Sequence, residues 1–403
     1  MTRRNAIVAL LFIAGTAAAL IAFAGDHHGY DLRVYRGAVR SWLAGGDLYG
    51  YVHPGVLHQG FTYPPFAAIT LIPLAVLPLT LGAVLNQAAT GLAITGTTWV
   101  VLRPLARCLS QPVWLVTTVG TCLVCLLEPV RDTMGFGQVN MYLVALIVGD
   151  LLLLGPDRRW SGIGVGLATA VKLTPGLFIV FLFLTGRRRA ACTATSAAAA
   201  ATLFALLVAP ATSARFWLHT LHDTSRVGSF DEVSNQSLAG LLTRLLDVPR
   251  PPLLLWLPLI ACVLTVGLHR ACRAARCGNE LAALALVGVT ACLVSPISWT
   301  HHLWWVVPAV VVLIQDGLGY RRLASAVAAL GVLAIFTFSL PEHVALGPTG
   351  HAVLGSVDWF GENAYVLVLL GLLLAMPVRA DVTEAERLAS VTTGRAAPPV
   401  PVP

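Results

Sequence analysis

Apolar residues recur along this chain in runs of about 20, separated by short polar segments. A helix of about that length crosses the hydrocarbon core of a bilayer while its backbone groups bond to one another. The pattern therefore predicts an all-α fold, a polytopic bundle of transmembrane helices. Spans are predicted at about 6–24, 80–102, 112–128, 139–154, 190–210, 252–269, 280–297, 302–315, 322–340 and 362–378.

One further interval has too little chain for two full crossings. It runs from Trp160 to Gly186 between two basic flanks, and it is predicted to hold two short half-helices that meet near Lys172-Leu173-Thr174-Pro175. Pro175 lacks a backbone N–H and favours a break there. Broken helices at membrane depth are tolerated where they line a cavity. With this pair, the bundle is expected to contain about twelve helices.

Composition supports a membrane protein and excludes a soluble one. Of the 403 residues, 57% are hydrophobic and only 11% are charged, whereas about 25% of the residues of a soluble domain are charged. Residues 1–379 are expected to form a single transmembrane domain. Residues 380–403, rich in Ala, Thr and Pro, are expected to form a disordered cytoplasmic tail.

Basic residues stand in short clusters between the apolar runs. A net charge of +7 would suit nucleic acid if it followed one face, but this spacing is the positive-inside pattern, so no nucleic-acid partner is expected. Placing every cluster in the cytoplasm gives a consistent topology with both termini inside. The clusters are Arg3/Arg4, Arg103/Arg107, Arg158/Arg159, Arg187 to Arg189, Arg270/Arg273/Arg276, Arg321/Arg322 and Arg379.

The first 24 residues have a second interpretation as a secretory signal peptide. Arg3 and Arg4, the apolar run and Ala22-Phe23-Ala24 fit such a segment and its cleavage site. An uncleaved anchor is favoured, because the apolar run is longer than that of a usual signal peptide. Cleavage would also leave an odd number of crossings.

Polar residues gather on the side of the membrane opposite to the arginine clusters. They lie in loops at 25–63 and 211–250, in the segment 128–140, at Lys172 and at 298–302. Ionisable groups at membrane depth are costly and by default mark a functional site. Lys172 is the only lysine of the chain, which suggests that a compact ammonium is required there. The site is therefore expected on the extracytoplasmic face of the plasma membrane.

The first outer loop is predicted to contain an amphipathic helix that lies in the membrane interface. Leu32, Tyr35 and Val39 share one helical face, arginines fill the other, and Gly45-Gly46 ends the helix. Asp31 stands at its N-terminus. A carboxylate there is favoured by the helix dipole, so Asp31 is either a capping residue or a residue of the site.

Six motifs, from about residue 30 to about residue 310, give the chain a family resemblance. In these motifs and their order it resembles the polyprenyl-phosphate-mannose-dependent alpha-(1-2)-mannosyltransferases of actinobacteria, glycosyltransferase family 87, a branch of the C-type glycosyltransferases. The family's usual Asp before the paired histidines is Thr300 here, so no role is carried over for that carboxylate. The motifs are Asp31-Leu-Arg-Val-Tyr35 with Leu48-Tyr49, Phe61-Thr-Tyr-Pro-Pro65, Glu128-Pro-Val-Arg131 leading to Gly137-Gln-Val-Asn140, Lys172-Leu-Thr-Pro175, Asn235-Gln-Ser237, and Ser295-Pro-Ile-Ser-Trp-Thr-His-His302.

The resemblance implies a C-type (GT-C) fold and an outer-face aspartate, Asp31, as catalytic base. One carboxylate suffices for inversion, because it accepts the proton of the attacking sugar hydroxyl while the lipid phosphate leaves as a stable anion. Lys172, His301, His302 and Arg131 are expected to bind the donor phosphate. No spacing matches a recognised metal site, so neither metal nor cofactor is expected. Sugar or acceptor contacts are expected from Tyr35, Tyr63, Glu128, Gln138, Asn140, Asn235, Gln236 and Trp299.

The expected partners are a polyprenyl-phosphate sugar, a glycolipid or lipoglycan acceptor, and membrane lipid. Another sugar on the same scaffold, arabinofuranose or glucose, stays open, as do the acceptor and the linkage position. A transporter or lipid flippase is the alternative from a different class. It would show inverted repeats and ionisable residues spread through the midplane, whereas here no repeat is evident and the polar groups lie on one side.

Overall fold

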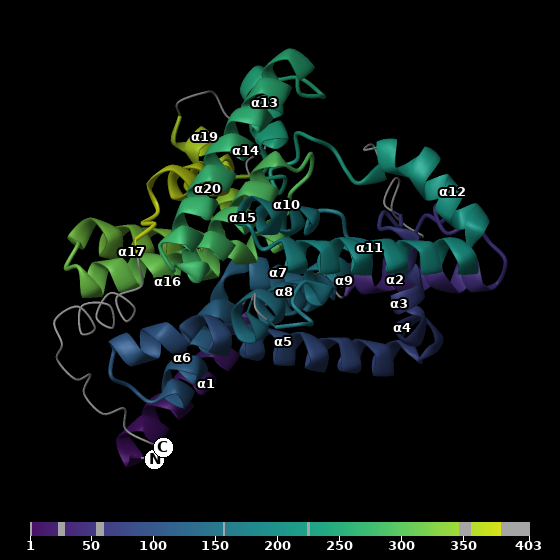
Figure 1. Ribbon diagram of the computed structural model, residues 1–403. Coiled ribbons are helices and arrows are strands. Elements are labelled where there is room, and N and C mark those ends of the chain that lie inside the picture. The colour runs from purple at the N-terminus through teal and green to yellow at the C-terminus, as the bar shows by residue number, and fades with distance from the viewer. Residues whose placement is uncertain are drawn as a thin grey trace.

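The computed structural model describes residues 2–22, 29–53, 60–155, 158–223, 226–345 and 356–379. Helices and the loops between them make up these ranges, which contain no strand. The tail predicted at 380–403 and Asp26 to His28 lie outside the described residues. Figure 1 shows the helices in their order. They are α1 (Arg3–Ala22), α2 (Tyr30–Leu43), α3 (Pro65–Thr70), α4 (Ile72–Val76), α5 (Leu79–Cys108), α6 (Val113–Leu126), α7 (Glu128–Phe136), α8 (Asn140–Val148), η1 (Gly149–Leu154), α9 (Ile163–Val171), α10 (Gly176–Leu184), α11 (Arg188–Val208), α12 (Pro210–Leu218), η2 (Thr220–His222), α13 (Leu238–Leu246), α14 (Leu253–Arg276), α15 (Glu280–Val294), η4 (Thr300–Trp305), α16 (Val306–Gly319), α17 (Leu323–Thr337), α18 (Leu340–Ala345), α19 (Val357–Glu362) and α20 (Ala364–Ala375).

Every predicted span has a helical counterpart at nearly the same residues. Within the described ranges, four helical stretches are long and apolar enough to cross a bilayer alone: α1, α11, α14 and the joined η4–α16. Shorter apolar helices cover 140–154, 280–294, 323–337 and 364–375. The chain is therefore an all-helical, multi-pass type of protein, and a total of twelve crossings stays a prediction.

The helix break predicted at Lys172 is present. α9 ends at Val171, Lys172 is extended with φ −147° and ψ 131°, and α10 begins directly after Pro175. α9 is held in place at its other end by a neighbouring helix. The carboxylate of Asp150, in η1, accepts the backbone N–H groups of Gly162 at 2.7 Å and of Val165 at 3.0 Å, which caps α9 from outside its own chain segment.

A second break was not predicted. α6 and α7 are bent by 74° at Leu127, which is extended. Pro129 stands in the first turn of α7, where its missing N–H is tolerated. The bend turns the polar helix α7 away from the apolar direction of α6.

The centre of the bundle is α15. Its residues from Leu281 to Leu293 are buried without interruption, because α14, α16 and α20 surround it. A helix that is apolar on all sides is expected in such a position. α15 therefore carries the segment after it, 295–302, on a rigid support.

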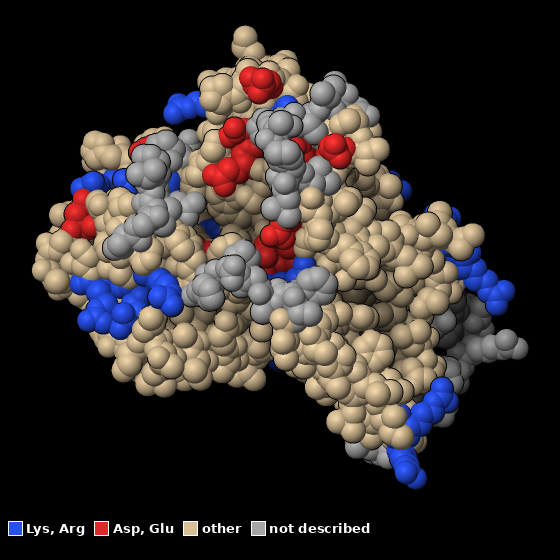
Figure 2. All heavy atoms as spheres, turned by 180° about the vertical axis from the view of Figure 1, so that it is seen from behind, with Lys and Arg blue, Asp and Glu red and all other residues tan. Residues whose placement is uncertain are grey.

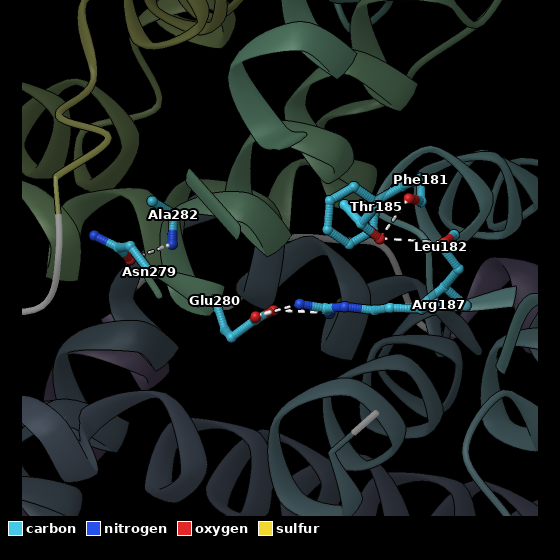
Figure 3. Close-up of polar contacts among 7 residues, drawn as sticks. All are labelled: Phe181, Leu182, Thr185, Arg187, Asn279, Glu280 and Ala282. Atoms are coloured by element: carbon cyan, nitrogen blue, oxygen red, sulfur yellow. Dashed lines mark hydrogen bonds and ion pairs between the residues drawn. The ribbon is translucent and has the colours of Figure 1, made fainter. Parts of the chain in front are cut away.

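One ion pair marks the end of the bundle away from that segment. Arg187, before α11, binds Glu280, at the start of α15, through both guanidinium nitrogens (Figure 3). Beside it, Asn279 caps α15 by accepting the N–H of Ala282 at 2.9 Å. The bidentate pair ties the α10–α11 turn to the α14–α15 turn. Since Glu280 and Ser295 stand at opposite ends of α15, the clusters at 187–189 and 270–276 lie at the end remote from the 295–302 segment.

The first outer loop has its own small core. The amphipathic helix is present as α2 and ends before Gly45, which has φ +87°. Its buried face packs on α4 and α7 and into an aromatic cluster, so protein covers much of that face, and its place in the membrane interface stays a prediction. Ring centroids in the cluster lie 5.5–6.2 Å apart, in tilted or edge arrangements that aromatic pairs prefer. The cluster consists of Tyr35, Tyr49, Phe61, Tyr63 and Phe216.

Candidate active site

A cavity of about 670 Å³ opens where the polar segments meet. Its walls come from α2, the segment 60–64, α7, the break at 172–174, residues 220–223 and 226–234, the segment 295–302 and α18. The space-filling view shows acidic side chains gathered around a recess on one face, with the larger basic groups toward its edges (Figure 2). Segments far apart in the chain therefore bring the ionisable residues to one place.

Asp31 lies in the first turn of α2 and faces this cavity. Its Oδ2 accepts the side-chain N–H of Gln138 at 2.6 Å. The residue at the helix cap is Gly29, in the left-handed conformation with φ +68°, so Asp31 is not the N-cap. Burial raises the pKa of Asp31 to about 6, while the bond from Gln138 and the charge of Lys172 oppose that rise. A carboxylate in this condition is suited to accept a proton near neutral pH.

Three further side chains stand behind Asp31. The Tyr35 hydroxyl donates to Gln138 Oε1 at 2.8 Å, the Tyr63 hydroxyl lies 3.4 Å from the same oxygen, and the two hydroxyls are 3.2 Å apart. All three residues are nearly inaccessible, with Gln138 only 4% exposed. The amide orientation of Gln138 is thereby determined.

Lys172 forms the cationic side of the cavity. Its Nζ donates to Asn140 Oδ1 at 3.1 Å and lies 2.8 Å from His302 Nε2. It also lies 5.3 Å from the centre of the Tyr63 ring, within cation–π range. Tyr63 therefore contacts both Tyr35 and Gln138, which stand behind Asp31, and the ammonium of Lys172.

His302 is held in one orientation. Its Nδ1 accepts the backbone N–H of Trp299 at 3.2 Å. In a neutral imidazole the proton then resides on Nε2, which faces Lys172. In this tautomer the 2.8 Å contact between Nζ and Nε2 joins two N–H donors and is no hydrogen bond, so both donors are satisfied only by an acceptor rich in oxygen placed beside them.

The acidic part of the cavity lies on α7 and α18. Glu128 and Asp132, one turn apart on α7, are both buried, and Glu342 on α18 lies near enough to act on both charges. Tyr365 of α20 donates a hydrogen bond to Glu128, and Thr300 donates one to Asp132. Thr300 thus supports a carboxylate from another helix.

Comparison with known proteins decides the family. The model of glycosyltransferase family 87 matches residues 61–296, more than half of the chain. The chain belongs to glycosyltransferase family 87. This family 87 enzyme is 31% identical over 386 residues, 90% of both chains, to the polyprenol-phosphate-mannose-dependent alpha-(1-2)-phosphatidylinositol mannoside mannosyltransferase of Mycobacterium tuberculosis.

Two other curated relatives of this family 87 enzyme are similarly close. The protein of the same name from Mycolicibacterium smegmatis is 35% identical over 343 residues, 78% of this chain and 77% of the relative. A pentamannoside mannosyltransferase of Mycobacterium tuberculosis is 33% identical over 317 residues, 77% of this chain and 72% of the relative. No solved structure matches the chain significantly. The match to the family model ends before His301 and His302 and begins after Asp31. The place of these three residues in the site therefore rests on the geometry described above.

Most of the expected site residues of this family 87 enzyme meet at the cavity. Asp31, Tyr35, Tyr63, Glu128, Gln138, Lys172, Trp299, His301 and His302 all line it. Asn140 borders a smaller cavity of about 60 Å³ on the other side of Lys172 and His302. Among the residues of the described ranges, no three His, Cys, Asp or Glu side chains are grouped to hold a metal ion.

Besides Asn140, three expected ligands do not line the main cavity. The side chain of Asn235 bonds the backbone of Phe230, Pro296 and Ser298, and that of Gln236 bonds the backbone of the 233 and 362–366 segments. Both are fully buried. Arg131 turns its guanidinium to the carbonyls of Leu126 and Thr337 and to the Ser339 hydroxyl. We therefore assign these three to the framework that holds the walls.

Other cavity residues were not anticipated as ligands. Arg226, Glu232 and Glu342 line it, and Arg226 donates a hydrogen bond to the carbonyl of Tyr49. The signal for the first two was their position in a loop already expected to be outside the membrane. Glu342 lies in α18, and this one short acidic helix is the only signal that the chain returns to the site there within the described residues.

Proposed function

We propose that this enzyme transfers mannose from a polyprenyl-phosphate-mannose donor to a mannoside of a glycolipid or lipoglycan on the outer face of the plasma membrane. It forms an α-1,2 linkage with inversion. One observation carries the proposal: a carboxylate, Asp31, and two neighbouring N–H donors, the ammonium of Lys172 and the imidazole of His302, line one cavity together with Tyr63. The names of the mycobacterial relatives supply the sugar, the lipid carrier and the linkage.

The chemistry follows from these groups. Asp31 accepts the proton of the attacking acceptor hydroxyl, whose oxygen forms a bond to C1 of the donor mannose as the bond from C1 to the phosphate oxygen breaks. The electron pair stays on the lipid phosphate. Lys172 and the Nε2–H of His302 stabilise that anion by charge and by hydrogen bonding. One displacement inverts the anomeric centre, so a β-linked donor gives an α-linked product.

The acceptor is proposed to enter along the acidic wall. The carboxyl groups of Glu128, Asp132 and Glu342 can hydrogen-bond the hydroxyls of a neutral sugar, whereas a lipid phosphate is attracted to Lys172. This leaves the side of Lys172 for the donor. The two substrates therefore meet at Asp31 from different sides.

The arrangement of the chain favours an outer-face site. The arginine clusters at 187–189 and 270–276 lie at the helix ends away from the cavity-lining segment 295–302. By the positive-inside rule those ends are cytoplasmic, and the cavity then faces outward.

The test is transfer by the purified protein. Polyprenyl-phosphate-mannose is incubated with phosphatidylinositol mannosides and simple mannosides, and the product is digested with an exo-acting α-1,2-mannosidase and examined by NMR. We expect an α-1,2-mannosyl product. Product from polyprenyl-phosphate-arabinofuranose or polyprenyl-phosphate-glucose alone would replace mannose by that sugar. Lipid flipping in vesicles without any transfer would overturn the enzyme reading of this site.

A further inference from the structure

We infer that Tyr63, Tyr35 and Gln138 form a one-way chain of hydrogen-bond donors that ends on Asp31 and aims its carboxylate. Gln138 is in this view a positioning residue and not a sugar ligand. The inference rests on the proposed role of Asp31 as the base. This hydrogen-bond chain is defined by four contacts among buried side chains.

The direction of the chain is determined at Gln138. Its Nε2 lies 2.6 Å from Asp31 Oδ2, and its Oε1 receives the Tyr35 hydroxyl at 2.8 Å. The flipped amide would place its oxygen 2.6 Å from an oxygen of the ionised carboxylate, a repulsive contact between two acceptors in a buried place. Because Gln138 is 4% exposed, water has little access to correct such a mismatch.

The order of the two tyrosines follows. Tyr35 has one hydroxyl proton and gives it to Gln138 Oε1, so it cannot also donate at its 3.2 Å contact with Tyr63; the one proton of Tyr63 goes to the Tyr35 oxygen or, at 3.4 Å, to Gln138 Oε1 itself. Tyr63 is therefore the first donor of the chain. Its ring faces Lys172 at 5.3 Å, so the residue that starts the chain also contacts the cation proposed for the donor phosphate.

The hydrogen-bond chain matters because burial alone would favour the protonated form of Asp31, which cannot accept a proton. Burial raises the pKa of Asp31, and the N–H from Gln138 and the charge of Lys172 hold it at about 6. Among the described residues, the other titratable groups that interact with Asp31 are Tyr30, Tyr35 and Tyr63. Burial raises the pKa of each phenol, so they stay neutral in the working range. Lys172 and Gln138 therefore decide the ionisation of Asp31.

The size of the effect can be stated. A hydrogen bond to an ionised group corresponds to about one to two pH units. Gln138→Met keeps length and volume but donates nothing. It is expected to move the acid limb of the kcat/KM profile from about pH 6 to about pH 7–8. Tyr35→Phe only frees the amide to rotate, so its shift is expected in the same direction and below about one unit.

The experiment is a kcat/KM profile from pH 5 to 9 for wild type, Gln138→Met and Tyr35→Phe. Tyr51→Phe is the matched control, because the Tyr51 hydroxyl contacts His53 in the same loop and its side chain is absent from the cavity wall. Gln138→Met should lose most activity near pH 6 and regain it as the pH rises. A purely structural role would instead lower the rate equally at every pH. An unmoved acid limb overturns the inference.

A second measurement separates this inference from the proposed function. Aspartate labelled with ¹³C at its carboxyl group gives an isotope-shifted infrared band, and the band lost in Asp31→Asn belongs to Asp31. Its titration requires no substrate. A titration midpoint of Asp31 that rises in Gln138→Met supports the hydrogen-bond chain even if mannose is not the sugar. An unchanged midpoint refutes the hydrogen-bond chain even if mannose is transferred.

Discussion

Replacing Asp31 by Asn changes one side-chain oxygen to an amide nitrogen, and we expect this change to affect catalysis and stability in different ways. The change keeps the size of the side chain, and the amide oxygen still accepts the N–H that Gln138 now gives to Oδ2 at 2.6 Å. The proton acceptor is lost. Loss of a general base costs about 10² to 10⁴ in rate, so transfer should fall by that factor.

Stability should change in the opposite direction. The pKa of Asp31 rises from 3.8 to about 6 in the folded protein. One pKa unit corresponds to about 1.4 kcal/mol, so an ionised Asp31 costs the folded state on the order of 3 kcal/mol at neutral pH. The cost is absent below about pH 4, grows as the pH rises through the interval up to 6, and is constant above it. Asn never carries this charge and should melt at a higher temperature near pH 7.

Product formation and the melting temperature in detergent are measured together at pH 4, 6 and 7.5. Asp47→Asn is the control from the same loop, where the carboxylate is 41% exposed and pairs with Arg215. We expect that control to remain active. The Asp31→Asn protein should be inactive throughout and should gain stability over wild type only at the two higher pH values.

Two outcomes would refute this reasoning. An Asp31→Asn enzyme that keeps most of the wild-type rate would remove Asp31 as base and direct the search to Glu128 and Asp132. A variant that melts lower than wild type at pH 7.5 would show that the ionised carboxylate stabilises the fold, contrary to the effect of its burial.

Three other predictions concern the cation, the framework and the topology. Lys172→Ala should raise the KM for the lipid-phosphate donor about 10- to 100-fold, the worth of a charge-assisted hydrogen bond, in a protein that still folds; an unchanged KM would make Lys172 structural. Arg244→Met should lower the melting temperature, because the buried guanidinium donates to the Glu232, Asn235 and Asn363 oxygens, whereas the exposed Arg250→Met should not; equal melting temperatures would contradict the framework role. In a background without the native cysteines, Ser229→Cys should react with an impermeant thiol reagent on whole cells and Arg188→Cys should not; labelling at 188 would invert the topology.

The helices could be predicted from sequence because the signal is local. Apolar runs and arginine clusters placed the spans, and the proline at 175 with its neighbouring lysine placed one break. The end of α6 near residue 128 was signalled by Glu128 and Pro129, but nothing local indicates that the chain continues as a helix bent by 74°. The bend is caused by the polar helix α7 turning into the site.

The site could be predicted as a set of residues but not as an arrangement. Gln138 stands 107 residues from Asp31 and 75 from Tyr63, and no periodicity connects positions so far apart. Asn235 and Gln236 were expected to bind sugar because they are polar residues of an outer loop. A buried backbone needs the same side chains to satisfy its N–H and C=O groups, and composition cannot distinguish the two uses.

The inward-facing amides of Asn235 and Gln236 have a consequence for how such an enzyme changes its substrate. They fasten the main chain from behind, so the surface toward the cavity is left to other residues, among them Val227 and Val233. Exchanging one of these alters the shape and charge that a sugar meets without breaking a bond that holds the wall. A duplicated copy of this gene can therefore acquire a new acceptor through a few substitutions that leave the stability of the fold unchanged. The reaction centre is inherited intact.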